Sequence, residues 1–362
     1  MVRKRCAVFR VDASTSIGTG HVMRCLTLAD RLRNTMDEIH FLSRGHEGNL
    51  VDLIDGRGFP VTRLPTTRTA DAATAHSSWL GASLQEDCEQ CLAAINRLGT
   101  RPSLLVVDHY ALDKRWEQAL RAAVERILVI DDLADRPHEC DVLLDQNLHE
   151  SPESCYSGLV HPSARVFVGP RYALLRPEFD AVTPRVRDSG VNAILAFFGG
   201  DGESNEIMKL LDALRALEQE APRVTVVTGH GNPNTSRVRH AARELRNIRI
   251  VETTSRMADL MVEADLGVGT CGGAAWERCA VGLPTLAVIT AENQREDARL
   301  LHERGAVRNL GEASNMTAGR WADAILTIKH DPEALKRMSL AAADVLQGRA
   351  GAMQELEAAL VV

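Results

Sequence analysis

A short apolar run, then a loop of polar or glycine residues, then a helical stretch recurs along this chain. Examples include residues 6–14, 103–111, 193–202 and 285–293. Continuous apolar runs that alternate with helices are typical of parallel strands covered on both faces. The pattern therefore predicts an α/β fold with doubly wound parallel sheets. Ligands bind at the carboxyl ends of such strands, so the loops after the runs contain the candidate functional residues.

The length of the chain and one break in the pattern predict two domains. A chain of 362 residues is usually too long to fold around a single hydrophobic core. The stretch from about Gly169 to Gly190 carries prolines and mixed charge, so we expect the linker there. The expected domains are residues 1–175 and 185–340, two similar α/β halves with a cleft between them. A C-terminal helix over 341–362 is expected to pack on either half.

Composition and charge exclude several classes of function. The 42 Lys and Arg residues against 49 Asp and Glu give a net charge of -7, which disfavours nucleic-acid binding through phosphate contacts. The sequence has no stretch of about 18 apolar residues, so no membrane span is expected, and no signal peptide is expected either. Eight scattered cysteines indicate reduced thiols and a cytoplasmic protein. Cys88 and Cys91 have C-x-x-C spacing, but they lie in a predicted helix and no second pair follows.

The first loop places a histidine between a glycine turn and a helix. Gly18, Gly20 and His21 directly precede a stretch with a helical apolar stripe, and Arg24 lies one turn after His21. The glycines allow the backbone to approach a ligand closely. A neutral imidazole in the first turn of a helix suits a general base near pH 7. The alternative is a histidine that only caps or packs. The spacing matches neither a dinucleotide fingerprint nor a Walker loop, so NAD and ATP are not implied.

Three further loops offer groups that suit a nucleotide sugar. Backbone N–H groups at Gly272 and Gly273 would hold a diphosphate without a metal. Glu277, one turn into the next helix, would accept hydrogen bonds from ribose hydroxyls; the alternative is an exposed helix carboxylate. A matching glycine turn and neutral hydrogen-bonding groups follow two other runs, at Gly199, Gly200, Asn293 and Gln294.

A second group of polar residues follows two neighbouring runs. Asp108 and His109 end one run, and Asp131 and Asp132 end the next. Adjacent parallel strands would bring them together, and their oxygens suit Mg²⁺. The alternative is that they cap helices or hold loops. No G-x-S-x-G elbow signals a serine nucleophile.

Six segments between about residue 6 and residue 295 share a pattern with known proteins. In order they are VDASTSIGTGHVMRCLTLA, VVDHYALDKRWE, IDDLADRPHECDVLLDQN, GPRYALLRPEF, WERCAVGLPTL and ENQ. Jointly they resemble the UDP-2,4-diacetamido-2,4,6-trideoxy-β-L-altropyranose hydrolases of pseudaminic acid biosynthesis (the PseG/SpsG-like family). The resemblance implies a GT-B-like fold of two Rossmann-like domains. It implies hydrolysis of that UDP-sugar to UDP and free sugar, with inversion at the anomeric carbon and with no metal or other cofactor.

The resemblance also assigns roles to residues. It implies that His21 is the base that activates water and that Glu277 and Asn293 bind substrate. In the resulting mechanism Asp12, Tyr110 and Asn147 contact the sugar.

The chain departs from the family pattern in two places, and these departures leave the sugar open. Residues 199–203 read GGDGE where GGSDP is expected. Residues 273–275 read GAA where hydroxyl side chains are expected. A GT-B glycosyltransferase, a sugar-nucleotide epimerase that hydrolyses UDP-sugar and a non-catalytic sugar-nucleotide-binding protein remain alternatives. A nucleotide sugar is the expected partner, and a monomer is favoured.

Overall fold

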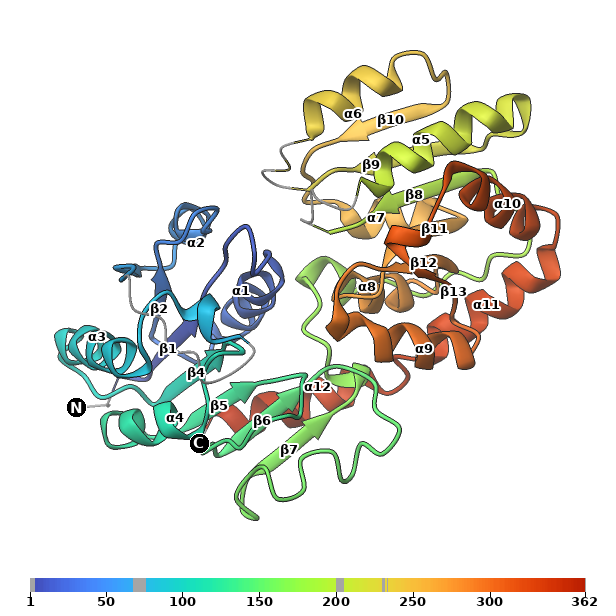
Figure 1. The fold of residues 1–362 in the computed structure, drawn as a ribbon. Helices are drawn as coiled ribbons and strands as arrows, with labels where there is room; N and C mark the ends of the chain where they lie inside the picture. The colour runs from blue at the N-terminus through green and yellow to red at the C-terminus, as the bar shows by residue number, and fades with distance from the viewer. Residues whose placement is uncertain (1–3, 68–75, 200–204, 230–231, 233, 362) are drawn as a thin grey trace. The chain divides into compact units, whose positions relative to one another are not determined.

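The computed structural model describes residues 4–67, 76–199, 205–229, 232 and 234–361 (Figure 1). The chain divides into two compact units. Unit 1 contains residues 1–147, 151–174 and 349–362, and unit 2 contains residues 148–150 and 175–348. Each unit has one parallel sheet with its own core.

Unit 1 is built on a seven-stranded sheet with the order β3-β2-β1-β4-β5-β6-β7, and its strand pairs are parallel. The strands are β1 (Cys6–Val11), β2 (Glu38–Arg44), β3 (Val61–Leu64), β4 (Leu104–Asp108), β5 (Ile127–Ile130), β6 (Val142–Asp145) and β7 (Arg165–Val168). The main helices are α1 (Gly20–Leu32), α2 (Val51–Gly56), α3 (Leu84–Arg97), α4 (Lys114–Leu120) and α12 (Arg349–Leu360).

Both faces of this sheet are buried, because alternate strand residues enter two different cores. Phe9 and Val106 pack in one core, whereas Val8 and Leu105 pack in the other. Strands covered on both faces lose the polar alternation of half-exposed strands, which explains the continuous apolar runs. The doubly wound arrangement expected from the runs is confirmed.

Unit 2 repeats the strand order of the first six strands of unit 1. Its sheet has the order β10-β9-β8-β11-β12-β13. The strands are β8 (Ala193–Phe197), β9 (Arg223–Val227), β10 (Ile248–Val251), β11 (Leu266–Thr270), β12 (Thr285–Ile289) and β13 (Val307–Glu312). The helices are α5 (Glu206–Leu217), α6 (Thr235–Ala242), α7 (Met257–Glu263), α8 (Ala274–Ala280), α9 (Arg295–Glu303), α10 (Ala318–Lys329) and α11 (Pro332–Asp344).

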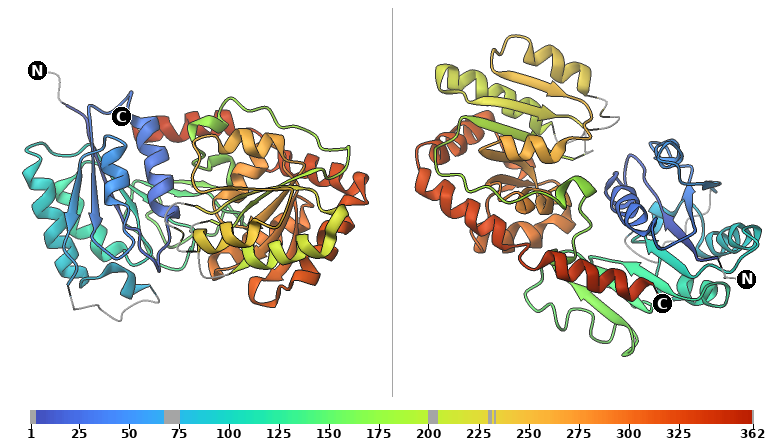
Figure 2. Two further views of the ribbon diagram at one scale, coloured as in Figure 1. Left: turned by 90° about the horizontal axis from the view of Figure 1, so that it is seen from above. Right: turned by 180° about the vertical axis from the view of Figure 1, so that it is seen from behind.

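The C-terminal region is divided between the two units. Helix α11 belongs to unit 2, while α12 packs on unit 1, where Figures 1 and 2 show it as the red helix against the green strands. Its Met353 and Leu356 are buried in the core that contains Phe9. The predicted segment 341–362 therefore begins inside α11 rather than at an element boundary. No helix in the described part of the chain is long and apolar enough to cross a membrane.

Candidate active site

The imidazole of His21 lies against a carboxylate from the neighbouring strand. Helix α1 begins at Gly20, so His21 is in its first turn, and Asp108 ends β4, which pairs directly with β1. The Nδ1 atom of His21 lies 2.6 Å from Oδ1 of Asp108. His21 is only 8% exposed, so this contact is largely shielded from water.

Arg24, one helical turn after His21, binds two carboxylates. Its Nε donates to Oδ2 of Asp108 at 2.7 Å and its Nη2 donates to Oδ1 at 2.7 Å. Its Nη1 donates to Oδ2 of Asp132 at 2.7 Å. Burial alone would raise the pKa of Asp108, but the charges and hydrogen bonds of Arg24 and His21 outweigh burial and lower it. Asp108 is therefore a carboxylate at neutral pH.

These contacts determine which nitrogen of His21 carries the proton. Asp108 is ionised and can only accept, so Nδ1 donates to it. The Nη2 atom of Arg24 lies 3.2 Å from the same nitrogen but has Asp108 as its acceptor. The remaining ring nitrogen, Nε2, is then the acceptor of neutral His21. A histidine held in this tautomer is suited to take a proton from water.

Aromatic side chains surround the imidazole. The Tyr110 ring meets it edge-on at a centroid distance of 4.6 Å, and the phenol hydroxyl donates to Asp132. The indole of Trp79 stacks on Tyr110 at 5.6 Å and lies 6.4 Å from His21. His76 packs against both Trp79 and Tyr110. Tyr110 is buried here as a packing partner of His21, and its expected role as a sugar contact stays a prediction.

Asp12 is buried in this structure, and its expected role as a sugar contact stays a prediction. Its carboxylate is fully buried and accepts from Nη1 of Arg10 and from the backbone N–H of Arg44, each at 2.6 Å. Oδ2 lies 3.3 Å from Nε2 of His109. Arg10 and Arg44 also bind the buried Asp87. Asp12 therefore belongs to an ion-pair network inside unit 1.

The alternative interpretation of Asp108, His109, Asp131 and Asp132, as residues that hold the loops in place, fits their contacts better than a magnesium site. Asp108 and Asp132 are bridged by Arg24, and Asp131 pairs with Arg136 at 2.8 Å. Guanidinium groups thus take the places that a cation would need, and no group of metal ligands occurs in the described residues.

Asn147, the third expected sugar contact, follows β6. Strand β5 lies between β6 and β4 in the sheet, and the backbone N–H of Asn147 donates to Asp145. Gly18 has a φ of 78° and its N–H donates to Ser14, so it closes a tight loop before α1. Gly20 has negative φ and no neighbouring atom within 4 Å of where a β-carbon would stand.

In unit 2 two of the predicted loops lie together at the carboxyl ends of β11 and β12. Oε1 of Gln294 accepts from the backbone N–H and the hydroxyl of Thr290. Its Nε2 lies 3.7 Å from where a β-carbon on Gly272 would stand. Gly273 is the N-cap of α8, and Asn293 is exposed on the same short turn as Gln294. Gly199 follows β8 with a φ of 82°, and Gly200 lies outside the described residues.

Glu277 is held by an arginine that the sequence analysis did not select. Nε and Nη2 of Arg176 donate to its two carboxylate oxygens, each at 2.7 Å. Glu277 is only 9% exposed, so it is not the exposed helix carboxylate of the alternative interpretation. A carboxylate that accepts a bidentate arginine keeps further lone pairs for ligand hydroxyls. Arg176 lies in the GPRYALLRPEF segment that contributes to the family resemblance, and this is the sequence feature that could have identified it.

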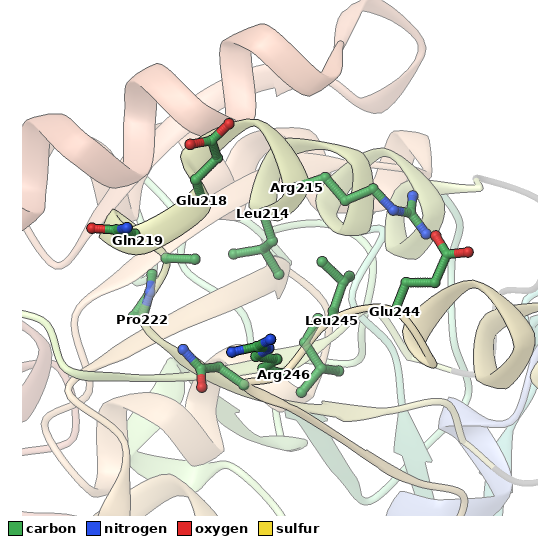
Figure 3. Close-up of a pocket in the computed structure, with 11 residues that line it drawn as sticks. Leu214, Arg215, Glu218, Gln219, Pro222, Glu244, Leu245 and Arg246 are labelled. Carbon is green, nitrogen blue, oxygen red and sulfur yellow. The ribbon is translucent and has the colours of Figure 1, made fainter.

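A cavity of about 500 Å³ in unit 2 lies at the amino-terminal ends of the strands, opposite the glycine turns. It is lined by residues such as Pro222 and Asn247, which directly precede β9 and β10. Figure 3 shows Leu214 and Leu245 inside the ring of lining residues. Because the glycine turns follow the carboxyl ends of the strands, this cavity is separate from them.

Comparison with known proteins shows similarity to one family model and to curated proteins, each over part of this chain. Residues 194–359 match the glycosyltransferase family 28 C-terminal domain. The UDP-2,4-diacetamido-2,4,6-trideoxy-beta-L-altropyranose hydrolase of Campylobacter jejuni is 26% identical over 303 residues, which cover 82% of this chain and 96% of that protein. The spore coat polysaccharide biosynthesis protein SpsG of Bacillus subtilis is 27% identical over 154 residues, or 42% of this chain and 45% of that protein. The chain is therefore similar to PseG/SpsG-like proteins over most of its length.

The solved structures show the fold of the chain. MurG of Acinetobacter baumannii superposes with a TM-score of 0.65 at 14% identity, covering 97% of this chain and 99% of that chain. Such low identity establishes architecture and not activity. The chain therefore has the GT-B architecture of two Rossmann-like domains, as expected.

Proposed function

We propose that the protein hydrolyses a UDP-sugar at the anomeric C–O bond, with inversion, to give UDP and the free sugar. The proposed substrate is UDP-2,4-diacetamido-2,4,6-trideoxy-β-L-altropyranose. The observation that carries the reaction class is the buried His21–Asp108–Arg24 arrangement, which leaves Nε2 of the imidazole as a proton acceptor. The similarity to the Campylobacter jejuni hydrolase over most of both chains supports the substrate.

Each unit contributes different chemistry to this mechanism. In unit 1, His21 removes a proton from the attacking water, and Asp108 stabilises the imidazolium that forms. In unit 2, backbone N–H groups of the Gly272–Gly273 turn bind the diphosphate, and Glu277 and Asn293 bind the nucleoside. UDP leaves as a stabilised anion, so no second carboxylic acid is needed to protonate the leaving group.

The decisive experiment is turnover of a panel of UDP-sugars in ¹⁸O-labelled water with EDTA, followed by NMR and mass spectrometry. We expect the label on C1 of the free sugar, unlabelled UDP, and an inverted anomeric configuration. EDTA should leave the rate unchanged, since the proposed mechanism uses no metal. Label in UMP or in a sugar phosphate means attack at phosphorus and contradicts the proposal.

A glycosyltransferase is the second candidate, because residues 194–359 match a glycosyltransferase domain. A transferase would turn over only when an acceptor is added, and water would not appear in the product. Release of UDP with C2 inverted in the sugar would instead identify an epimerase that hydrolyses its substrate. Tight UDP binding without any product would identify a binding protein. The monomeric state and the cytoplasmic location stay predictions.

A further inference from the structure

Almost every buried arginine in the described part of the chain has its charge compensated. Four in unit 1 pair with aspartates: Arg10, Arg24, Arg44 and Arg136. In unit 2, all three nitrogens of Arg187 donate to backbone carbonyls, those of Ala264, Arg185, Val281 and Met261. This is expected, because a buried charge without compensating groups is costly.

Arg278 is different. It lies on α8 and is 3% exposed. Its Nη2 donates to the carbonyl of Thr270, but Nε and Nη1 are buried without a hydrogen-bond partner in the described residues. No carboxylate in that part of the chain forms an ion pair with it, although the charge of Glu277, which is paired with Arg176, also acts on it. An arginine side chain stays protonated in proteins, so within the described residues the guanidinium is a buried positive charge without a paired anion.

Two glycines of β11 make room for this side chain. A β-carbon on Gly267 would lie 3.0 Å from Cδ of Arg278, and one on Gly269 would lie 3.0 Å from its Nη1. Residues two apart point to the same face of a strand, so the side chain runs along β11 toward its carboxyl end. The guanidinium reaches the carbonyl of Thr270, directly before the turn that contains Gly272 and Gly273. The unpaired charge therefore lies behind that turn.

We propose that Arg278 is the counter-charge for a phosphate or diphosphate group bound at the Gly272–Gly273 turn. It is a positioning residue, because it is covered by the chain and acts on the anion through a medium of low dielectric constant. That the anion is the diphosphate of UDP rests on the function proposed above. Cleavage of the sugar bond increases the negative charge on UDP, so the same guanidinium would stabilise the leaving group.

The test is calorimetric binding of pyrophosphate, UDP and uridine to the full chain and to Arg278→Gln. We expect the substitution to weaken UDP and pyrophosphate at least tenfold and to change uridine less than twofold. Arg187→Gln is the matched control, a buried arginine of the same unit whose donors are all used by carbonyls. It should lower the unfolding temperature without changing the ratio of UDP to uridine affinity. Arg278→Lys keeps the charge and should bind UDP within about threefold of the wild type.

Two results would overturn the proposal. One is an equal loss of uridine and UDP affinity in Arg278→Gln, or in Arg278→Lys if the glutamine variant does not fold. The other is unchanged pyrophosphate and UDP binding in a folded Arg278→Gln. The proposed function fails separately, if the wild type binds pyrophosphate through Arg278 but releases no UDP from any UDP-sugar.

Discussion

At the scale of single residues, Asp108 connects the groups of the candidate active site. It accepts from Nδ1 of His21 and from two nitrogens of Arg24, and Arg24 extends the contacts to Asp132. One buried carboxylate thus orients both the imidazole and the guanidinium. Substitutions at His21 and Asp108 should therefore affect the same chemical step for different reasons.

His21→Ala removes the proposed base. We expect kcat to fall at least about 100-fold, since general bases typically contribute 10²–10⁴-fold. UDP binding should stay within about twofold, because the residues proposed to bind UDP belong to unit 2. Steady-state kinetics with titration of UDP measures both quantities. Turnover close to that of the wild type would rule out His21 as the base.

Asp108→Asn keeps the shape of the side chain but removes its charge. An amide nitrogen facing Nδ1 would favour the tautomer with the proton on Nε2, which cannot accept a proton from water. The Arg24 guanidinium would also lose a buried partner. We expect kcat to fall at least about 100-fold, with UDP affinity unchanged and the far-UV spectrum preserved. A folded variant with normal kcat would show that Asp108 does not set the tautomer.

At the scale of elements, the loop before α1 places His21 in the first turn of the helix. Gly18 adopts a φ of 78° and closes the loop through its hydrogen bond to Ser14. Gly20, two residues later, has ordinary backbone geometry, and both glycines have open space where a β-carbon would stand. A substitution at Gly18 therefore tests the need for a left-handed backbone conformation, whereas a substitution at Gly20 tests the need for open space beside His21.

Gly18→Ala and Gly20→Ala form a matched pair. Gly18→Ala should reduce the free energy of unfolding by about 1–2 kcal/mol, the cost of a left-handed conformation for a residue with a β-carbon. Gly20→Ala should change stability by less than about 0.5 kcal/mol but lower kcat/KM, because its methyl group would occupy space beside His21. Urea unfolding and kinetics on both variants test this. Full activity in Gly20→Ala would show that no ligand approaches the backbone there.

At the scale of the whole molecule, the two units use charge differently. Unit 1 buries Asp12, Asp87, Asp108 and Asp131. Burial alone would raise their pKa values, but neighbouring arginines and histidines outweigh burial and lower them. In the described part of unit 2, carboxyl groups with lowered pKa are those of exposed residues such as Glu292 and Glu296.

This difference predicts that acid unfolds unit 1 first. A carboxyl group whose pKa is lower in the folded chain stabilises it above the unfolded pKa of about 3.9, and this stabilisation is lost as the pH falls through the folded value. Peptic cleavage at pH 3, read by mass spectrometry, should therefore cut unit 1 at least tenfold faster than unit 2. The same digestion at pH 4.5 is the control and should show a smaller difference. Faster cleavage of unit 2 at pH 3 would contradict the argument.

The sequence by itself determined the architecture and identified the loops that contain the candidate functional residues. Buried parallel strands must be apolar on both faces, so β1, β8 and β11 appear as continuous runs, and the loops after them contain the glycine turns. Outer strands are less regular: β7 has two exposed residues, and β10 has one exposed and three half-buried residues, which breaks the apolar run. Local pattern therefore found the centre of each sheet more readily than its edges.

The partners of the functional side chains were decided only by the tertiary structure. Asp108 is 87 residues from His21, and Arg176 is 101 residues from Glu277. Which loops meet depends on strand order, and β1 lies beside β4 because the chain crosses over after β3, which no local pattern specifies. For the same reason the sequence did not show that Asp12 binds Arg10 and Arg44. The local sequence shows which side chains can do chemistry, but long-range packing decides which of them lie next to one another.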